Sequence, residues 1–179
     1  YYCGEEMMST ARAALGQSTL EELIQPCVDE LAVKASLSAA YFHWDEDWIY
    51  LRLKHEWPDN FHYADIGYRK HPLHHTFFRC IQPYLDRKRL KKIGVSQEDT
   101  ELLSQIKEDG HYSQYEKYAF TLFRVCAPVF YAERGIVAGS IGVTSLALDH
   151  TPKEIETLTV IVSQSAQKAA QALANTQLK

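Results

Sequence analysis

The chain has 179 residues, of which 46% are hydrophobic and 23% are charged, and its formal net charge is −4. This composition is that of a folded globular domain, and it excludes a disordered tail, a collagen-like repeat and a coiled-coil rod. At about 150 residues per domain, residues 1–179 form one domain, and its mild acidity disfavours a protein that binds nucleic acid unaided.

Two helices are expected at the start of the chain. The first covers residues 5–15, and the second follows Ser18, because Ser18 and Glu21 form a capping box. Pro26 should kink this second helix. Its hydrophobic residues recur at helical spacing and lie on one stripe: Leu20, Leu23, Ile24, Cys27, Val28 and Leu31.

The hydrophobic period then changes to two, which predicts strands. Residues 38–44 and 48–55 are the first two strands, joined by the acidic turn 45–47. Residues 61–68 are a weaker third strand. Hairpin-length connections of this kind join antiparallel neighbours.

Two helices are expected in the middle of the chain. One follows Pro72 and has a single apolar stripe of Leu73, Phe77, Ile81 and Leu85. The other begins at Ser96 and ends at Gly110, a residue that favours the helix C-terminus. The basic run 87–92 lies between them and is interpreted as a solvated helix end or loop.

The last third of the chain is expected to add three strands and a helix. The strands cover residues 112–118, 120–131 and 136–146, and the final pair is a hairpin. The helix begins at Thr151 with a capping box and Pro at its first position. One face of it is apolar: Ile155, Leu158, Val162, Ala166, Ala169 and Leu173. The sequence therefore predicts an α+β fold with one antiparallel sheet of about six strands flanked by helices.

The cysteines and the chain ends indicate a cytoplasmic location. The four cysteines show no C-x-x-C spacing, so free buried thiols in a reducing compartment are expected. Residues 1–6 do not resemble a signal peptide, and the longest apolar run, 125–132, is too short to span a membrane. Because the first residue is not Met, we expect the chain to be a fragment of a longer protein.

No metal or other cofactor is expected. His71, His74 and His75 lie close together with His62 nearby, but the H-E-x-x-H pattern and a supporting Cys pair are missing. Capping and surface roles are favoured over a metal site. No glycine-rich phosphate loop occurs among the eight glycines.

Cys80 is a weak candidate nucleophile. A Cys–His pair needs a thiolate in an open cleft, and the histidines at 74 and 75 are close in sequence. Bulky apolar residues surround it, namely Phe77, Phe78, Ile81 and Leu85, so a buried structural thiol is favoured.

Arg124 is unusual because it lies in the middle of the most apolar predicted strand. Alternation places it on the same face as Leu122 and Cys126. A buried guanidinium needs a partner, so one interpretation is a salt bridge to Glu116 or another acid. The other is a clamp for an anionic ligand. The next strand offers small and hydroxyl residues on one face: Ser140, Gly142 and Thr144.

Several segments resemble, in order and spacing, the effector-binding domain of IclR-family bacterial transcription regulators. The resemblance extends over nearly the whole chain and is found in residues 2–4, 23–31, 71–74, 110–112, 125–130 and 135–145. It implies a GAF-like sheet that senses a small metabolite and contributes to homodimers or tetramers. DNA would be bound only through an N-terminal winged helix-turn-helix, which is absent from residues 1–179.

The same resemblance implies an effector site. Its members are Arg124, Gly142, Thr144, Phe77, Phe78 and Gln114. The family has smaller residues where this chain has Phe77 and Phe78, and a serine where it has Gly142. Arg124 favours an organic acid, and the aromatic rings suit an aromatic or longer carboxylate.

Three functions therefore compete. The favoured one is a ligand-sensing domain of a transcription regulator, which is not an enzyme. The alternatives are a dimerisation domain whose pocket is closed by Phe77 and Phe78, and a Cys/His hydrolase that uses Cys80.

Overall fold

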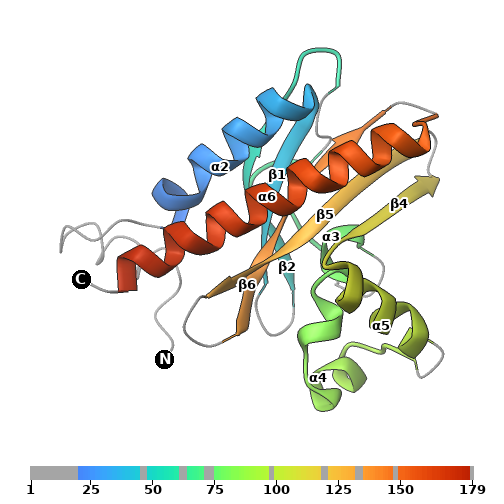
Figure 1. The fold of residues 1–179 in the computed structure, drawn as a ribbon. Coiled ribbons are helices and arrows are strands. Elements are labelled where there is room, and N and C mark those ends of the chain that lie inside the picture. The colour runs from blue at the N-terminus through green and yellow to red at the C-terminus, as the bar shows by residue number, and fades with distance from the viewer. Residues whose placement is uncertain are drawn as a thin grey trace.

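The computed structural model of the chain describes residues 20–44, 48–60, 64–70, 75–96, 99–117, 121–131, 135–146 and 149–177. Its strands form one six-stranded antiparallel sheet in the order β3-β2-β1-β6-β5-β4 (Figure 1). They are β1 (Ser38–Trp44), β2 (Ile49–His55), β3 (Arg69–Lys70), β4 (Tyr112–Lys117), β5 (Thr121–Tyr131) and β6 (Ile136–Ser145). The expected α+β fold and the antiparallel sheet of about six strands are confirmed.

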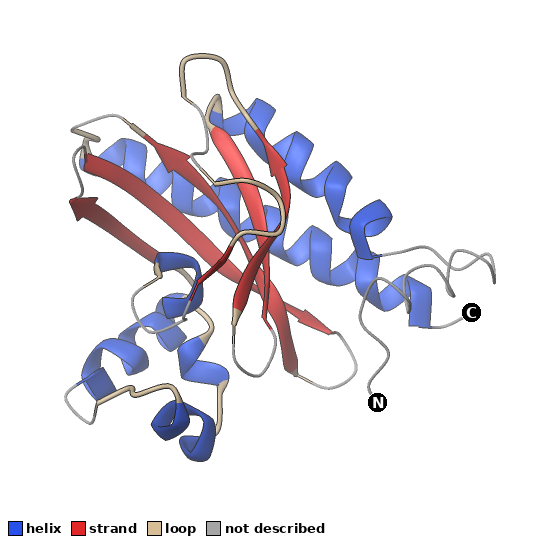
Figure 2. Ribbon diagram, turned by 180° about the vertical axis from the view of Figure 1, so that it is seen from behind, coloured by secondary structure: helices blue, strands red, loops and turns tan. Residues whose placement is uncertain are grey.

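Helices pack on both faces of the sheet. They are α2 (Leu20–Ala35), α3 (Thr76–Arg79), the 3₁₀ turn η2 (Gln82–Tyr84), α4 (Arg87–Lys92), α5 (Thr100–Asp109) and α6 (Pro152–Gln177). Figure 1 shows α2 and α6 side by side across one face, and Figure 2, from behind, shows the group α3 to α5 on the other. Within the described part of the chain, no helix combines the length and apolarity needed to cross a membrane.

Each face of the sheet has its own hydrophobic core. On the α2–α6 face, Ile24 and Leu31 of α2 and Val162 of α6 are fully buried against the strands. On the opposite face, Phe77 of α3 and Ile106 of α5 pack with residues of β1, β2 and β5. The two central strands β5 and β6 are therefore buried on both sides, which explains their nearly continuous apolar sequence.

The start of α6 has the predicted capping box. The backbone N–H of Thr151 donates to Glu154 Oε2 at 2.7 Å, and the N–H of Glu154 donates to Thr151 Oγ1 at 3.3 Å. The hydrogen bonds that the N–H and the hydroxyl of Thr151 donate to Glu154 Oε2 lower the pKa of the Glu154 carboxyl. The predicted end of α5 is also confirmed, because Gly110 takes the left-handed conformation with φ 69°.

Two predicted elements are wrong in the described residues. Residues 64–68 are not a strand, because the chain turns there with Gly67 at φ 86°, and only Arg69 and Lys70 pair with β2. The single helix expected after Pro72 is broken into α3 and η2. Pro83 cannot donate to the carbonyl one turn back, and it disfavours helical geometry in the residue before it.

The remaining predictions concern the basic run 87–92 and the segments outside the described residues. The basic run 87–92 forms the short helix α4, which is capped by Asp86 and has no buried residue. The predicted helix over residues 5–15 lies outside the described residues, as do Ser18 and the turn 45–47.

Strand β4 covers only part of β5. β4 begins at Tyr112, which lies opposite Cys126, and β5 continues past Cys126 to Tyr131. Pro128 lies in this extension. Among the described residues, only β6 pairs with residues 127–131 of β5.

Gly142 is required by close strand packing. A Cβ atom at this position would lie 2.2 Å from the carbonyl oxygen of Val125 and 2.8 Å from Cys126 Cα, so the backbone of β5 occupies the space. The absence of a side chain at Gly142 therefore permits the contact between β5 and β6.

We expect Gly142→Ala to destabilise the fold. Overpacking against a backbone costs about 1–3 kcal/mol, which exceeds the ~0.4–1 kcal/mol by which alanine disfavours the unfolded chain. Urea unfolding measures the difference, and Ser140→Ala on the same strand is the control, because the Ser140 hydroxyl has no hydrogen-bond partner among the described residues. Equal stability of the two variants would contradict the packing argument.

Candidate functional site

Four residues form a transverse row across the sheet, which we call the polar row. Gln114 of β4 lies opposite Arg124 of β5, Arg124 lies opposite Thr144 of β6, and Thr144 lies opposite Ser38 of β1. Directly opposed residues point to the same face of a sheet. Arg124 and Cys126 are two residues apart on β5, so their side chains lie on the same face of the sheet. Cys126 packs in the core beneath α3, and the polar row therefore faces that helical layer.

The members of the polar row differ in solvent exposure. Arg124, Thr144 and Ser38 are each 0% exposed, whereas Gln114 at the sheet edge is exposed. The Gln114 side chain accepts a hydrogen bond from the hydroxyl of Tyr112 at 3.0 Å. The structure therefore brings Arg124 and Thr144 together inside the domain and leaves Gln114 at its rim.

A single carboxylate connects Arg124 to helix α3. Arg124 Nη1 donates to Glu116 Oε2 at 2.5 Å, and the Thr76 hydroxyl donates to Glu116 Oε1. Glu116 is only 8% exposed, so this is a buried ion pair with a third polar partner. The salt bridge to Glu116 was one of the two interpretations of Arg124, and it is present.

Thr144 places a buried hydroxyl beside this ion pair. Its Oγ1 has no hydrogen-bond partner among the described residues, and the same is true of Ser140 Oγ on the same strand. Burying a hydroxyl without a hydrogen-bond partner costs free energy of folding. Such an atom therefore indicates a bound ligand, a bound water molecule or local strain. Ser38 is different, because its hydroxyl accepts from the N–H of Trp57 at 2.9 Å.

Aromatic rings of β1 and α3 form a wall on the same face of the sheet as the polar row. The ring centroid of Phe42 on β1 is 4.6 Å from that of Phe77 and 4.7 Å from that of His75. Phe78 points elsewhere, since its ring lies 4.6 Å from Trp44. The two predicted site phenylalanines thus have separate surroundings, although both are fully buried.

The cysteines of this face have the properties of structural thiols. Cys80 is fully buried, and its Sγ donates to the carbonyl of Phe77 at 3.3 Å. Cys126 Sγ donates to the carbonyl of Thr76 at the same distance, and burial raises the pKa of the Cys126 thiol. A raised pKa disfavours the thiolate that a nucleophile needs.

Only one member of the histidine cluster, His75, lies in the part of the chain that the structure describes. No group of three His, Cys, Asp or Glu side chains converges there. His75 is buried against Phe42 at the start of α3. His62, His71 and His74 lie outside the described residues.

The resemblance implied that residues 75–79, and so Thr76, lie at the effector site, but no signal in the sequence singled out Thr76 or Ser38. Thr76 precedes the two phenylalanines, and a threonine at the start of a helix is usually assigned a capping role. Ser38 begins a predicted strand whose partner, β6, is distant in sequence. Only the pairing of β1 with β6 brings Ser38 opposite Thr144.

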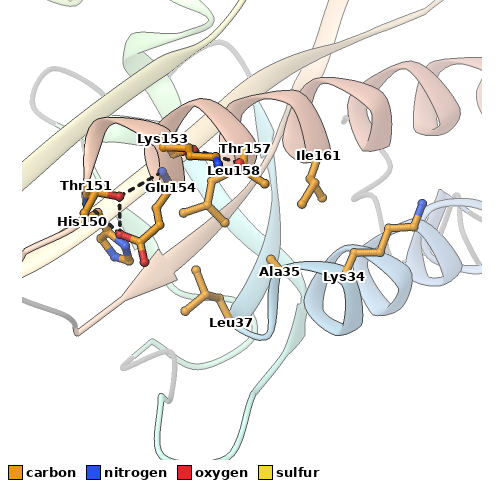
Figure 3. Close-up of a pocket in the computed structure, with 10 residues that line it drawn as sticks. All are labelled: Lys34, Ala35, Leu37, His150, Thr151, Lys153, Glu154, Thr157, Leu158 and Ile161. Carbon is orange, nitrogen blue, oxygen red and sulfur yellow. Dashed lines mark hydrogen bonds between the residues drawn. The ribbon is translucent and has the colours of Figure 1, made fainter.

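A separate groove lies on the other side of the sheet, between the end of α2 and the start of α6 (Figure 3). Its volume is about 420 Å³, and Leu37, Leu158 and Ile161 give it an apolar floor. The polar groups at its rim already serve local structure: Glu154 caps α6, and Lys34 pairs with Glu30 at 2.7 Å. The buried polar row is therefore the better candidate site.

No protein-family model matches the chain, and no curated protein matches it. Solved structures do match. The IclR regulator of Thermotoga maritima has a TM-score of 0.79 at 13% identity, over 97% of this chain and 76% of its own. The C-terminal domain of the Escherichia coli regulator KdgR has a TM-score of 0.73 at 20% identity, over 87% of this chain and 98% of its own.

A third match is the inducer-binding domain of a double mutant of the Acinetobacter transcription factor PobR, in complex with 3-hydroxybenzoic acid. Its TM-score is 0.71 at 15% identity, over 86% of this chain and 98% of the matched domain. The chain therefore has the fold of the effector-binding domains of these regulators, as the sequence resemblance implied.

We expect the Arg124–Glu116 pair to behave as one unit. Arg124→Met leaves a buried carboxylate without its cation and should cost about 3–5 kcal/mol of unfolding free energy. Adding Glu116→Leu should restore part of that loss, and a double-mutant cycle in urea measures the coupling.

The half-buried pair Arg52–Glu21, with N and O 2.5 Å apart, is the control. Arg52→Met should cost at most ~1 kcal/mol, because solvent screens the pair. Additive losses for Arg124→Met and Glu116→Leu would contradict the coupling.

Proposed function

We propose that this chain is the effector-sensing domain of a transcription regulator and binds a small organic acid at the polar row. The observation that carries the proposal is the fully buried Arg124 with the unpartnered hydroxyl of Thr144 directly opposite on the next strand. The fold shared with the PobR inducer-binding domain, which is solved with 3-hydroxybenzoic acid, supports a ligand of the same chemical class.

The ligand's carboxylate would compete with Glu116 for Arg124. A guanidinium presents several N–H donors in one plane, and a charge-assisted contact with a carboxylate is roughly twice as strong as a neutral hydrogen bond. The Thr144 hydroxyl would donate to the same carboxylate. The body of the ligand would pack against Phe42 and Phe77, whose rings lie 4.6 Å apart.

Glu116 would make the site selective. Because its carboxylate already neutralises Arg124, a weakly interacting anion gains little from displacing it. An effector therefore needs both an acid group and an apolar body that buries area against the aromatic wall. Gly142 and Gln114 contribute at the border of this site, the first by its close backbone packing and the second at the exposed end of the polar row.

The domain would act by binding and not by catalysis. The thiol of Cys80 is fully buried and bonded to the Phe77 carbonyl, which leaves it no access to a substrate. We propose that the regulator acts in the cytoplasm, self-associates as a dimer or tetramer, and contacts DNA through a separate N-terminal domain.

One observation favours a second candidate. Phe77 and Phe78 are both 0% exposed and belong to the core beneath α3. Such packing suits a domain that serves assembly without a ligand. Ligand binding, measured as follows, decides between the two functions.

A thermal-shift screen of aromatic and aliphatic carboxylates, each paired with its neutral amide, tests the site. An acid at 100-fold its Kd should stabilise the domain by about 2.7 kcal/mol, and the matched amide should not. Thr144→Val keeps the shape and removes the hydroxyl, so it should weaken acid binding roughly tenfold or more at unchanged stability.

Ser165→Ala is the control, because it removes a buried hydroxyl from α6, which lies on the opposite face of the sheet (Figure 1). Equal weakening by Ser165→Ala, or equal shifts by acids and amides, would contradict an acid site at Thr144. The absence of any stabilising compound would favour the assembly function.

Self-association is tested separately. Light scattering across micromolar concentrations should show a species of at least twice the monomer mass. The reason is the resemblance to IclR-family regulators, which implies a homodimer or tetramer. A monomer at all concentrations would contradict the proposal for this chain.

A further inference from the structure

A second groove in the helical layer has a charge opposite in sign to that of the whole chain. It lies between α4 and α5, which are neighbours in Figure 1, and its volume is about 650 Å³. The described residues that line it include Arg87, Lys91 and Lys107 and no carboxylate, in a chain whose net charge is −4. The basic run 87–92 of the sequence supplies two of these cations.

The two helices present similar faces to the groove. On α4, Arg87, Leu90 and Lys91 lie at spacings of three and four residues, and on α5 Leu103 and Lys107 are four residues apart. Residues at these spacings share one face of a helix. Each helix therefore lines the groove with a leucine and at least one cation.

The three cations are not neutralised within the described part of the chain. Nearby basic residues do have acidic partners, since Arg79 lies 3.1 Å from Asp99 and Arg89 lies 3.8 Å from Asp86. Arg87, Lys91 and Lys107 have no ion-pair partner among the described residues. Cations that line one groove and have no ion-pair partner attract anions from solution.

We propose that this groove binds a small amphipathic dianion, such as a phosphate monoester with an apolar body. Three cations suit a doubly charged head group better than a single carboxylate, and Leu90 and Leu103 offer an apolar surface for the rest of the molecule. The volume falls within the range of about 300–1,000 Å³ that is usual for small-molecule sites. The proposal is independent of the acid site at the polar row.

Phenyl phosphate, inorganic phosphate and phenol are the probes, and backbone amide NMR of the full chain is the measurement. Phenyl phosphate should shift amides of α4 and α5 and bind roughly tenfold tighter than inorganic phosphate, because the ring buries apolar area. Phenol should not bind measurably. Equal affinity for the two phosphates, or shifts centred on β4 to β6 instead, would overturn the proposal.

Lys91→Gln and Lys107→Gln should each raise the Kd of phenyl phosphate roughly fivefold or more, since each removes a charged donor. Lys88→Gln is the matched control: Lys88 is also exposed on α4 and makes the same charge change, but it does not line the groove. An equal loss in Lys88→Gln would show general attraction to the basic helix and would overturn the site. An acidic peptide that binds while phenyl phosphate does not would likewise overturn it.

Discussion

A buried positive charge in the middle of the sheet is the constraint on which the rest of this structure depends. Arg124 is 0% exposed on β5, a strand that has a neighbour on each side. Taking a guanidinium out of water costs several kcal/mol unless a counter-ion meets it. Glu116 meets it from β4, and Thr76 bonds the same carboxylate from α3. One carboxylate therefore connects two strands and the helix that covers them.

This arrangement links the proposed ligand site to the helical layer by direct contact. If an acid takes the place of Glu116 at Arg124, the carboxylate that Thr76 bonds changes its surroundings at the same time. The first element to respond would be α3, and α3 leads through η2 to α4 and α5. Ligand binding would thus be thermodynamically coupled to the position of this helical layer.

The sequence predicted the parts of the fold that depend on neighbouring residues. The capping box at Thr151 and the period-two strands 38–44 and 48–55 are local signals, and all appear in the structure. The partner of Arg124 was among the alternatives because Glu116 lies on the adjacent strand. The position of Ser38 opposite Thr144 could not be predicted, since it depends on the pairing of β1 with β6, about a hundred residues apart. The break at Pro83 was missed because helical spacing of apolar residues continues across it.

Because β4 begins only at Tyr112, opposite Cys126, it leaves the rest of β5 without this neighbour, which has a consequence for solubility. Beyond Cys126, β5 extends past β4, and among the described residues only β6 pairs with it there. An unpaired strand edge can recruit a strand from another molecule. Pro128 lies in this stretch and lacks the backbone N–H that a new ladder would need. Ala127, Pro128 and Val129 are also buried, so packing within the domain and the missing N–H both disfavour edge-to-edge aggregation at this part of the sheet.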